Sequence, residues 1–456
     1  MKTYQDLLKA IDEGKEMQFV KDCIDSHKSS TLYQEAIVAR EYFRKRNVTI
    51  KVFQKLLYDM TGQAIPDNYS ANYKLINAFF PIFVTQENNY LLGNGVTFNG
   101  KDTKDRVGGD EFDDVLMDAG EKALWGGLSF GFFNVDKVKV FDVTEFAPLW
   151  DENDGSLKAG VKFWQIDNNK PLWAILFKLD GWSEYKWVAG KKGEAVKENQ
   201  PYKLKIRTSE FDGMEILKGE NYPSFPVVPL WANKNHQSEF IGLQEKIDCY
   251  DLIQSGFANT IDDASVIYWT IQNAGGMDDI DLVKFLERMK TVKAAVVDEN
   301  GSSAQAHTLE IPYAARATLL SDLRDSLYRD AMALDTDKIT AGNVTATAIK
   351  SSYSNLDLKC DGFEFCVSNF IKGILKLANI DDSPSYKRNK IINMQEDTQM
   401  VLSAAQYLDD ETILKHLPFL SPDEIETILD KRVEEEAARF EESGEGVNGQ
   451  GEEANR

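Results

Sequence analysis

The stretch VVPLWANKNHQSEFIGLQEKIDCYDLIQSGFANTIDDASVIYWTI, residues 227–271, sets the pattern for the second half of the chain. It begins inside a turn-rich segment, 223–235, and then carries apolar residues at steps of three and four. Such steps place the apolar side chains on one face of a helix, which we expect over residues 236–263. The stretch ends in VIYWTI, whose β-branched and aromatic residues predict a strand.

A small α/β insert is expected directly after this helix, over residues 264–312. It reads as a strand (VIYWTI), a turn (NAGG), an amphipathic helix (IDLVKFLERMK) and a strand pair around KAAVVDENGSSAQAHTLEI. The chain then returns through a second helix, 313–331, which carries Leu320, Leu323 and Leu327 in one stripe. Two helices joined by an insert predict a stalk with a head.

The most regular apolar spacing belongs to a third, longer helix. Its seam alternates steps of four and three and consists of Ile349, Tyr353, Leu356, Cys360, Phe363, Val367, Phe370, Ile374 and Leu377. One seam of this kind packs against a neighbouring helix. Because Cys360 belongs to the seam, we expect a small buried hydrophobe there and not a nucleophile.

The first half of the chain has a different character. Residues 1–60 are expected to be helical and include the basic cluster Arg40, Arg44, Lys45 and Arg46, for which a solvated helix end is the favoured interpretation. Between Trp125 and Trp231, short aromatic and β-branched runs are separated by turn signals, which predicts antiparallel strands joined by hairpins. The fold class is therefore α+β.

Composition excludes several classes of protein. The 456 residues are 43% hydrophobic and carry a net charge of −22, which argues against a disordered chain and against a basic coat for nucleic acid. No apolar run approaches the ~18 to 20 residues of a membrane span. The charged N-terminus and four scattered cysteines indicate synthesis in a reducing cytoplasm.

Sequence signatures of catalysis and of metal binding are missing. We find no phosphate-binding G-x-x-x-x-G-K-[ST], no dinucleotide-binding glycine motif and no Cys/His spacing for zinc. The four histidines are isolated and are expected at the surface or at helix caps. We therefore expect no catalytic residue, no metal and no cofactor.

Three segments stand out along the chain: NYSANYKLINAFFPIFVTQENNYLLGNGVTF (68–98), ALWGGLSFGFFNVD (123–136) followed by FDVTEFAPLWDENDG (141–155), and the stretch 227–271. Taken in this order, they resemble the portal proteins of tailed double-stranded DNA bacteriophages. In the last of these, Asn233 precedes a long helix that leads into a small insert. The resemblance covers the chain roughly from Tyr33 to Phe440.

The resemblance implies a non-enzymatic, homo-oligomeric ring, typically dodecameric, at the portal vertex of a capsid. Double-stranded DNA would pass through its channel during packaging and ejection. Implied partners are the terminase large subunit and the capsid, scaffold and head-completion proteins, with no membrane. The implied location is the virion, after assembly in the host cytoplasm.

The resemblance also divides the chain into the parts of a portal: a mostly helical stem and crown, a β-rich wing and a small α/β clip. The expected parts are a wing at 1–235, a stem helix at 236–263, the clip at 264–312, a stem helix at 313–331, a tunnel loop at 332–345, wing again at 346–400, a crown at 401–440 and a disordered acidic tail at 441–456.

The tunnel loop is the candidate site, because the resemblance places it against DNA in the channel. Its residues are Asp335, Thr336, Asp337, Lys338, Ile339, Thr340, Ala341, Gly342, Asn343 and Val344. Lys338, Arg324 and Arg329 are the candidate channel cations in an otherwise acidic wall. From the residues alone, an ordinary helix connection fits the loop equally well.

Two other functions stay open at this point. The first is a soluble carbohydrate-active enzyme, which would need polar groups converging on Trp164, Trp173, Trp182 and Trp187. The second is another virion protein, such as a scaffold or an adaptor.

Overall fold

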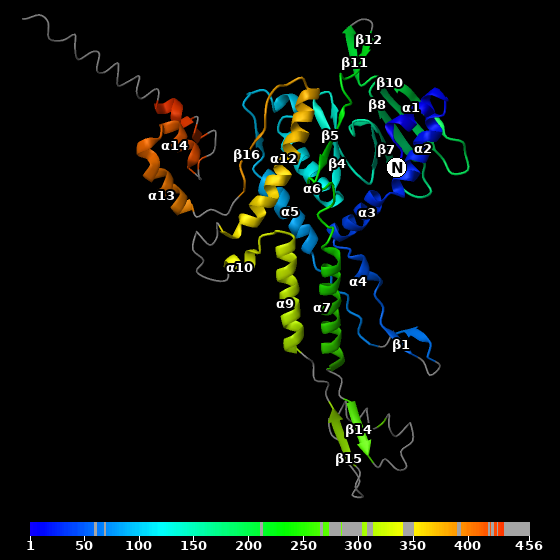
Figure 1. Ribbon diagram of the computed structural model, residues 1–456, viewed down its shortest axis with the longest axis vertical. Coiled ribbons are helices and arrows are strands. Elements are labelled where there is room, and N and C mark those ends of the chain that lie inside the picture. Colours follow the sequence, from blue (N-terminus) through cyan, green and yellow to red (C-terminus); the bar gives the residue numbers. More distant parts are fainter. Residues whose placement is uncertain are drawn as a thin grey trace, which may run out of the picture. The chain divides into compact units, whose positions relative to one another are not determined.

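Internal contacts divide the chain into two units, which Figure 1 draws in a computed structural model. The first unit comprises Met1–Val344 with Ile349–Asn389, and the second comprises Thr345–Ala348 with Lys390–Arg456. The structure describes residues 1–58, 62–67, 70–209, 213–264, 268–272, 284, 303–307, 313–340, 351–389, 394–417, 420, 424–425 and 427–432. Within these residues, no helix is both long and apolar enough to cross a bilayer.

The N-terminal residues are helical, as expected. The helices are α1 (Tyr4–Asp12), α2 (Glu16–Lys28), α3 (Thr31–Phe43) and α4 (Val48–Val52). Thr3 and Asp6 form a reciprocal capping box that begins α1, and Ser30 caps α3 by accepting a hydrogen bond from the Tyr33 backbone N–H. These caps satisfy backbone donors that the first turn of each helix would otherwise leave free.

The aromatic region forms antiparallel strands, which confirms the predicted hairpins. Five of them make one sheet in the order β10-β9-β8-β7-β6. Their bounds are β6 Phe146–Trp150, β7 Leu157–Trp164, β8 Leu172–Lys178, β9 Gly181–Trp187 and β10 Glu194–Gln200. Val161, Phe163, Leu176 and Tyr185 alternate onto one face of this sheet and share a core with α1 and α2.

A second, three-stranded sheet lies at the centre of the largest core. Its order is β13 (Val227–Trp231), β4 (Leu128–Asn134) and β5 (Lys137–Asp142). Helices α6 (Glu111–Gly126) and α12 (Ser354–Leu377) pack on it, and α5 (Phe79–Leu92) packs on both of these helices. Gly131 of β4 lets the ring of Phe370 approach the strand closely, since a Cβ at this position would overlap that ring.

The long seam helix is confirmed as α12. Seven predicted seam residues are buried on it: Leu356, Cys360, Phe363, Val367, Phe370, Ile374 and Leu377. Tyr353 is buried just before the helix begins, and Ile349 lies outside the described residues. Cys360 is fully buried, as its place in the seam predicted.

The two helices that are expected to form the stem are present as α7 (Gln244–Ala264) and α9 (Tyr313–Asp330), which lie side by side (Figure 1). The expected start of the first helix at residue 236 is wrong, because α7 begins eight residues later. His236 and Gly242 have φ values of +57° and +84°, which are incompatible with a continuous helix. Asn233 instead accepts hydrogen bonds from the Asn235 and Gln237 backbone N–H groups in a turn.

Of the predicted insert, the structure describes an antiparallel strand pair, β14 (Tyr268–Gln272) and β15 (Ser303–His307). The helix expected at IDLVKFLERMK lies outside the described residues apart from Lys284. Short elements elsewhere in the first unit are β1 (Leu56–Tyr58), β2 (Ala64–Pro66), β3 (Val96–Thr97), η1 (Asp105–Val107), β11 (Lys203–Ser209), β12 (Gly213–Glu220), α10 (Thr336–Thr340) and β16 (Ser385–Tyr386).

The second unit is helical in its described part. It contains α13 (Met394–Ala404), η2 (Ala405–Tyr407) and α14 (Asp410–His416), and Asp409 caps α14 by accepting from the Thr412 backbone N–H at 3.1 Å. Helix α13 spans residue 400, the expected boundary between wing and crown. The tail expected at 441–456 lies outside the described residues.

Candidate functional site

The first half of the candidate tunnel loop is partly helical. Helix α10 occupies Thr336–Thr340, and Asp335 precedes it. Asp335 accepts a hydrogen bond from the Asp337 backbone N–H at 3.2 Å, which helps to start the turn. Residues 341–344 of the candidate site, and the side chains of Ile339 and Thr340, lie outside the description.

Every candidate channel cation has an acidic partner. Arg324 contacts Asp335 at 3.0 Å and Asp337 at 2.5 Å. Lys338 contacts Asp325 at 2.8 Å. We call this group of paired charges the α9–α10 charge cluster. Its members are Arg324, Asp325, Arg329, Asp330, Asp335, Asp337 and Lys338.

The same pairing of charges continues toward helix α7. Arg329 lies 3.6 Å from Asp330, which also binds Lys246 of α7. The hydrogen bond from Lys246 lowers the pKa of Asp330. Sequence spacing alone did not show which acids reach Arg324, Arg329 and Lys338.

A buried ionic triad joins four segments next to this cluster, and sequence reasoning missed it. Nζ of Lys359 on α12 lies 2.8 Å from Oε2 of Glu87 on α5 and 2.9 Å from Oε2 of Glu239, just before α7. It also donates to the Ala331 carbonyl at the end of α9, at 3.0 Å. The triad therefore connects the start of α7 and the end of α9 to the core helices α5 and α12.

Burial controls the protonation of the triad. It raises the pKa of Glu87 to about 7, with Lys359 opposing that shift. Burial also disfavours the charge on Lys359, but Glu87 and Glu239 outweigh it and raise the pKa of Lys359. The Lys359 ammonium therefore stays charged at neutral pH, whereas the Glu87 carboxyl takes up a proton near neutral pH.

Replacing Glu87 with Gln should flatten the pH dependence of stability. In the folded chain the pKa of Glu87 is above its ordinary value of 4.5, so the folded state binds this proton more tightly than the unfolded state. The resulting stabilisation is complete below pH 4.5 and is lost as the pH rises to about 7. Thermal unfolding between these pH values should show a smaller decline for Glu87→Gln, and an unchanged slope would contradict this assignment.

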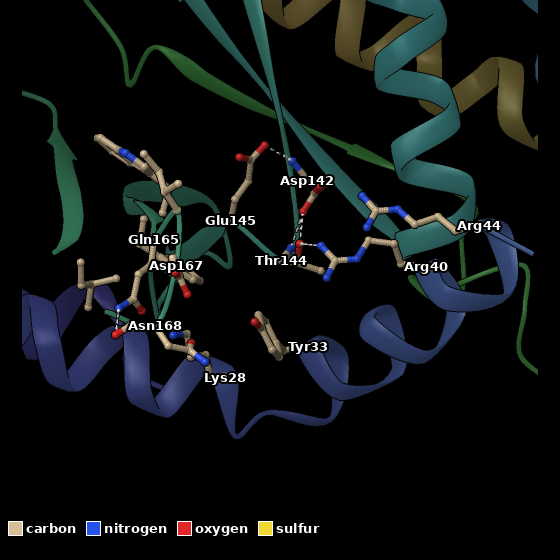
Figure 2. Close-up of a pocket in the computed structure, with 14 residues that line it drawn as sticks. Lys28, Tyr33, Arg40, Arg44, Asp142, Thr144, Glu145, Gln165, Asp167 and Asn168 are labelled. Atoms are coloured by element: carbon tan, nitrogen blue, oxygen red, sulfur yellow. Dashed lines mark hydrogen bonds between the residues drawn. The ribbon is translucent and has the colours of Figure 1, made fainter. Parts of the chain in front are cut away.

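A surface pocket of about 670 Å³ lies between the N-terminal helices and the two main sheets (Figure 2). Arg40 of α3 donates to Thr144 Oγ1 at 2.8 Å, and Thr144 donates to Asp142 at 2.6 Å. Burial, reinforced by Asp142, raises the pKa of Glu145. Three basic residues (Lys28, Arg40 and Arg44) and three acidic residues (Asp142, Glu145 and Asp167) share the described lining.

Two of the four clustered basic residues noted in the sequence, Arg40 and Arg44, line this pocket. Its described lining includes no histidine and no cysteine. Its charges are balanced, so it could accept a segment that carries both signs. His27 lies close by and is buried, bonded through Nε2 to the Val143 carbonyl at 2.7 Å, so its expected surface position is wrong.

The tryptophans of the five-stranded sheet do not converge on a common site. The rings of Trp164 and Trp173 stack on one face of the sheet, with their centroids 6.2 Å apart, and a lysine lies over each ring. Trp182 shares their face by strand alternation, whereas Trp187 packs on the opposite face with the α1–α2 core. In the described part of the chain, no group of three or more His, Cys, Asp or Glu side chains could hold a metal.

Comparisons with known proteins identify a family for this chain. A family model described as "Phage portal protein, SPP1 Gp6-like" matches residues 25–446. The chain belongs to this family. Portal proteins are structural, non-enzymatic components of the virion and form homo-oligomeric rings, so the carbohydrate-active alternative is set aside.

Individual portal proteins show the same relationship. That of Bacillus phage SPP1 is 24% identical over 466 residues, covering 92% of this chain and 86% of that protein. That of Clostridium phage phiCD119 is 30% identical over 215 residues, covering 45% of this chain. The matched region spans about half of that relative, 48%.

More distant similarities are found among solved structures of gene transfer agent particles. A chain from the neck of a native particle, computed with C12 symmetry, has a TM-score of 0.41 at 10% identity, covering 75% of this chain and 90% of that one. A chain from the native virion has a TM-score of 0.43 at 11% identity, covering 78% and 90%.

Proposed function

We propose that copies of this chain form the ring-shaped channel at one capsid vertex through which double-stranded DNA is packaged and ejected. The ring is a dodecamer that assembles in the host cytoplasm. It docks the terminase large subunit during packaging and contacts capsid, scaffold and head-completion proteins. The family match over most of the chain supports the portal role, and the α9–α10 charge cluster supports the mode of DNA passage.

In this proposal α7 and α9 form the stem, β14 and β15 belong to the clip, and the α9–α10 charge cluster faces the channel. DNA binds tightly to proteins whose cations replace its counterions. A cation already paired with a carboxylate replaces few of them. The observed pairing of Arg324 and Lys338 would therefore let DNA slide in either direction without being held.

The distribution of charge along the chain also supports passage of DNA without tight binding. Residues 401–456, the proposed crown and tail, contain 15 acidic and 5 basic side chains, for a net charge of −10 out of −22. Such a segment repels phosphate and opposes adsorption of packaged DNA.

Removing the carboxylates of the cluster should make the ring hold DNA. We expect the Asp325→Asn/Asp337→Asn ring to bind short duplex DNA more tightly than the wild-type ring, because Lys338 and part of Arg324 are released. The slope of log K against log salt should steepen by about 0.9 for each freed cation that reaches a phosphate. The measurement is a fluorescence-anisotropy titration of DNA with assembled rings across a salt series.

Asp12→Asn together with Asp22→Asn is the matched control, since it removes the same charge from helices α1 and α2 in the wing. These rings should keep the wild-type salt slope. Equal slopes for cluster and control variants would show that the α9–α10 charge cluster does not face DNA.

A further inference from the structure

An extended arm runs along one face of the stem helix α7. The arm comprises the described residues of 51–76, including the β1–β2 hairpin. Three alternate backbone N–H groups, two in the arm and one at residue 77 just beyond it, donate to α7 side chains four residues apart. The pairs are Tyr73 to Asn259 at 2.7 Å, Leu75 to Ser255 at 2.9 Å and Asn77 to Asp251 at 3.0 Å.

Helix α9 covers the opposite face of α7. Arg316 donates to Thr260 at 3.0 Å, Lys246 donates to Ser326 at 2.8 Å, and the rings of Phe257 and Tyr313 lie 5.6 Å apart. At 3.6 residues per turn, the α7 positions that hold the arm and those that hold α9 point roughly 180° apart. The arm and α9 therefore lie on opposite flanks of α7, as Figure 1 shows for α9, α7 and α4.

The arm leaves large apolar side chains uncovered in the protomer. Val52 is 78% exposed and Tyr73 is 52% exposed. The other exposed members are Phe53, Leu56, Ile65, Leu75 and Ile76. A concentration of exposed apolar side chains on one segment indicates a protein contact.

An exposed stripe along one side of α9 offers a second surface. This outer stripe consists of Ala315, Thr318, Leu319 and Asp322, and Leu319 is 46% exposed. Asp322 is exposed and has no ion-pair partner among the described residues. The arm in turn exposes Lys51 and Lys74. Attraction between Asp322 and an arm lysine would favour this contact, because two copies that each carry a net charge of −22 otherwise repel one another.

We propose that the arm of each protomer packs on the outer stripe of α9 of the next protomer, an inference that rests on the ring proposed above. Two different surfaces on opposite flanks make a head-to-tail contact, and repetition of such a contact with the right rotation closes a ring. Leu319 is then covered by arm residues such as Phe53, and Asp322 faces an arm lysine. The occupant of each flank is thus a second copy of this chain.

Paired cysteines test this contact directly. In a Cys249→Ser background, which removes the exposed native thiol, we would combine Leu319→Cys with either Phe53→Cys or Lys74→Cys. Assembled rings treated with a short bismaleimide should give a ladder of covalent oligomers on a denaturing gel. A ladder is expected because each protomer is linked to one neighbour through its arm and to the other neighbour through its α9. Single-cysteine variants should run as monomers on the same gel.

Val196→Cys paired with Phe53→Cys is the matched control, because Val196 is exposed on β10, away from both flanks; it should give no ladder. Rings that form but give no ladder with either arm cysteine would overturn the arm contact and leave the ring intact. Monomers in light scattering before any cross-linking would overturn the ring itself and the contact with it. Dimers from single-cysteine variants would show a face-to-face contact and would also overturn the proposed arm contact.

Discussion

Replacing Lys359 with Met should lower the free energy of unfolding by about 3 to 5 kcal/mol, the usual cost of removing one partner from a buried ionic group. The change leaves Glu87 and Glu239 facing each other in the core, with Glu87 only 2% exposed. It also leaves the Ala331 carbonyl without its ammonium donor. Thermal and urea unfolding at one fixed protein concentration would measure the effect.

Lys376→Met is the matched control, because Lys376 is exposed on the same helix, α12. It should change stability by less than about 0.5 kcal/mol, as surface substitutions usually do. Adding Glu87→Gln to Lys359→Met should recover part of the loss, since the Gln amide is neutral beside Glu239 without having to bind a proton. A Lys359→Met protein as stable as the wild type would show that the triad does not bear on folding.

Replacing Asp251 with Ala should be the next most damaging change. The Asp251 carboxylate is fully buried and accepts hydrogen bonds from the backbone and side chain of Asn77 and from the side chain of Asn47. An unsatisfied buried donor costs roughly 1 to 3 kcal/mol, so we expect a loss of about 2 to 4 kcal/mol. The arm should also loosen from α7.

Hydrogen exchange can separate the two effects of this substitution. In Asp251→Ala the amides of Tyr73 and Leu75 should exchange faster than in the wild type, because the arm loses its anchor at one end. Asp251→Asn keeps one carbonyl acceptor and should lose less stability. Glu245→Ala, an exposed change on the same helix, should leave both stability and exchange unaltered. Unchanged exchange in the arm of Asp251→Ala would contradict its role as an anchor.

Much of the fold could be predicted because periodic burial is a local property of the sequence. The seam on α12, the antiparallel hairpins and the helix 313–331 all follow from repeats of apolar residues within short windows. The start of α7 could not be predicted in this way. Leu243 fits the helical spacing, but the left-handed conformations of His236 and Gly242 end any helix there.

The charge arrangement of the candidate site could not be predicted, because it depends on contacts distant in sequence. Lys359 meets Glu87 and Glu239 only after α5, α12 and the segment before α7 have packed together. The spacing of Arg324, Asp335 and Asp337 allowed the ion pairs but did not require them. A chain with 74 acidic residues offers many such possibilities, so spacing alone does not select one.

One measurement tests the central claim, that the α9–α10 charge cluster lines a channel filled by DNA. A photo-cross-linking amino acid at position 338 would be incorporated into portal rings and carried into DNA-filled heads, with position 196 on β10 as the matched site. Irradiation should join the chain to DNA at position 338 and not at position 196, and empty heads should give no product. Cross-linking to DNA at position 196 but not at 338 would contradict the account.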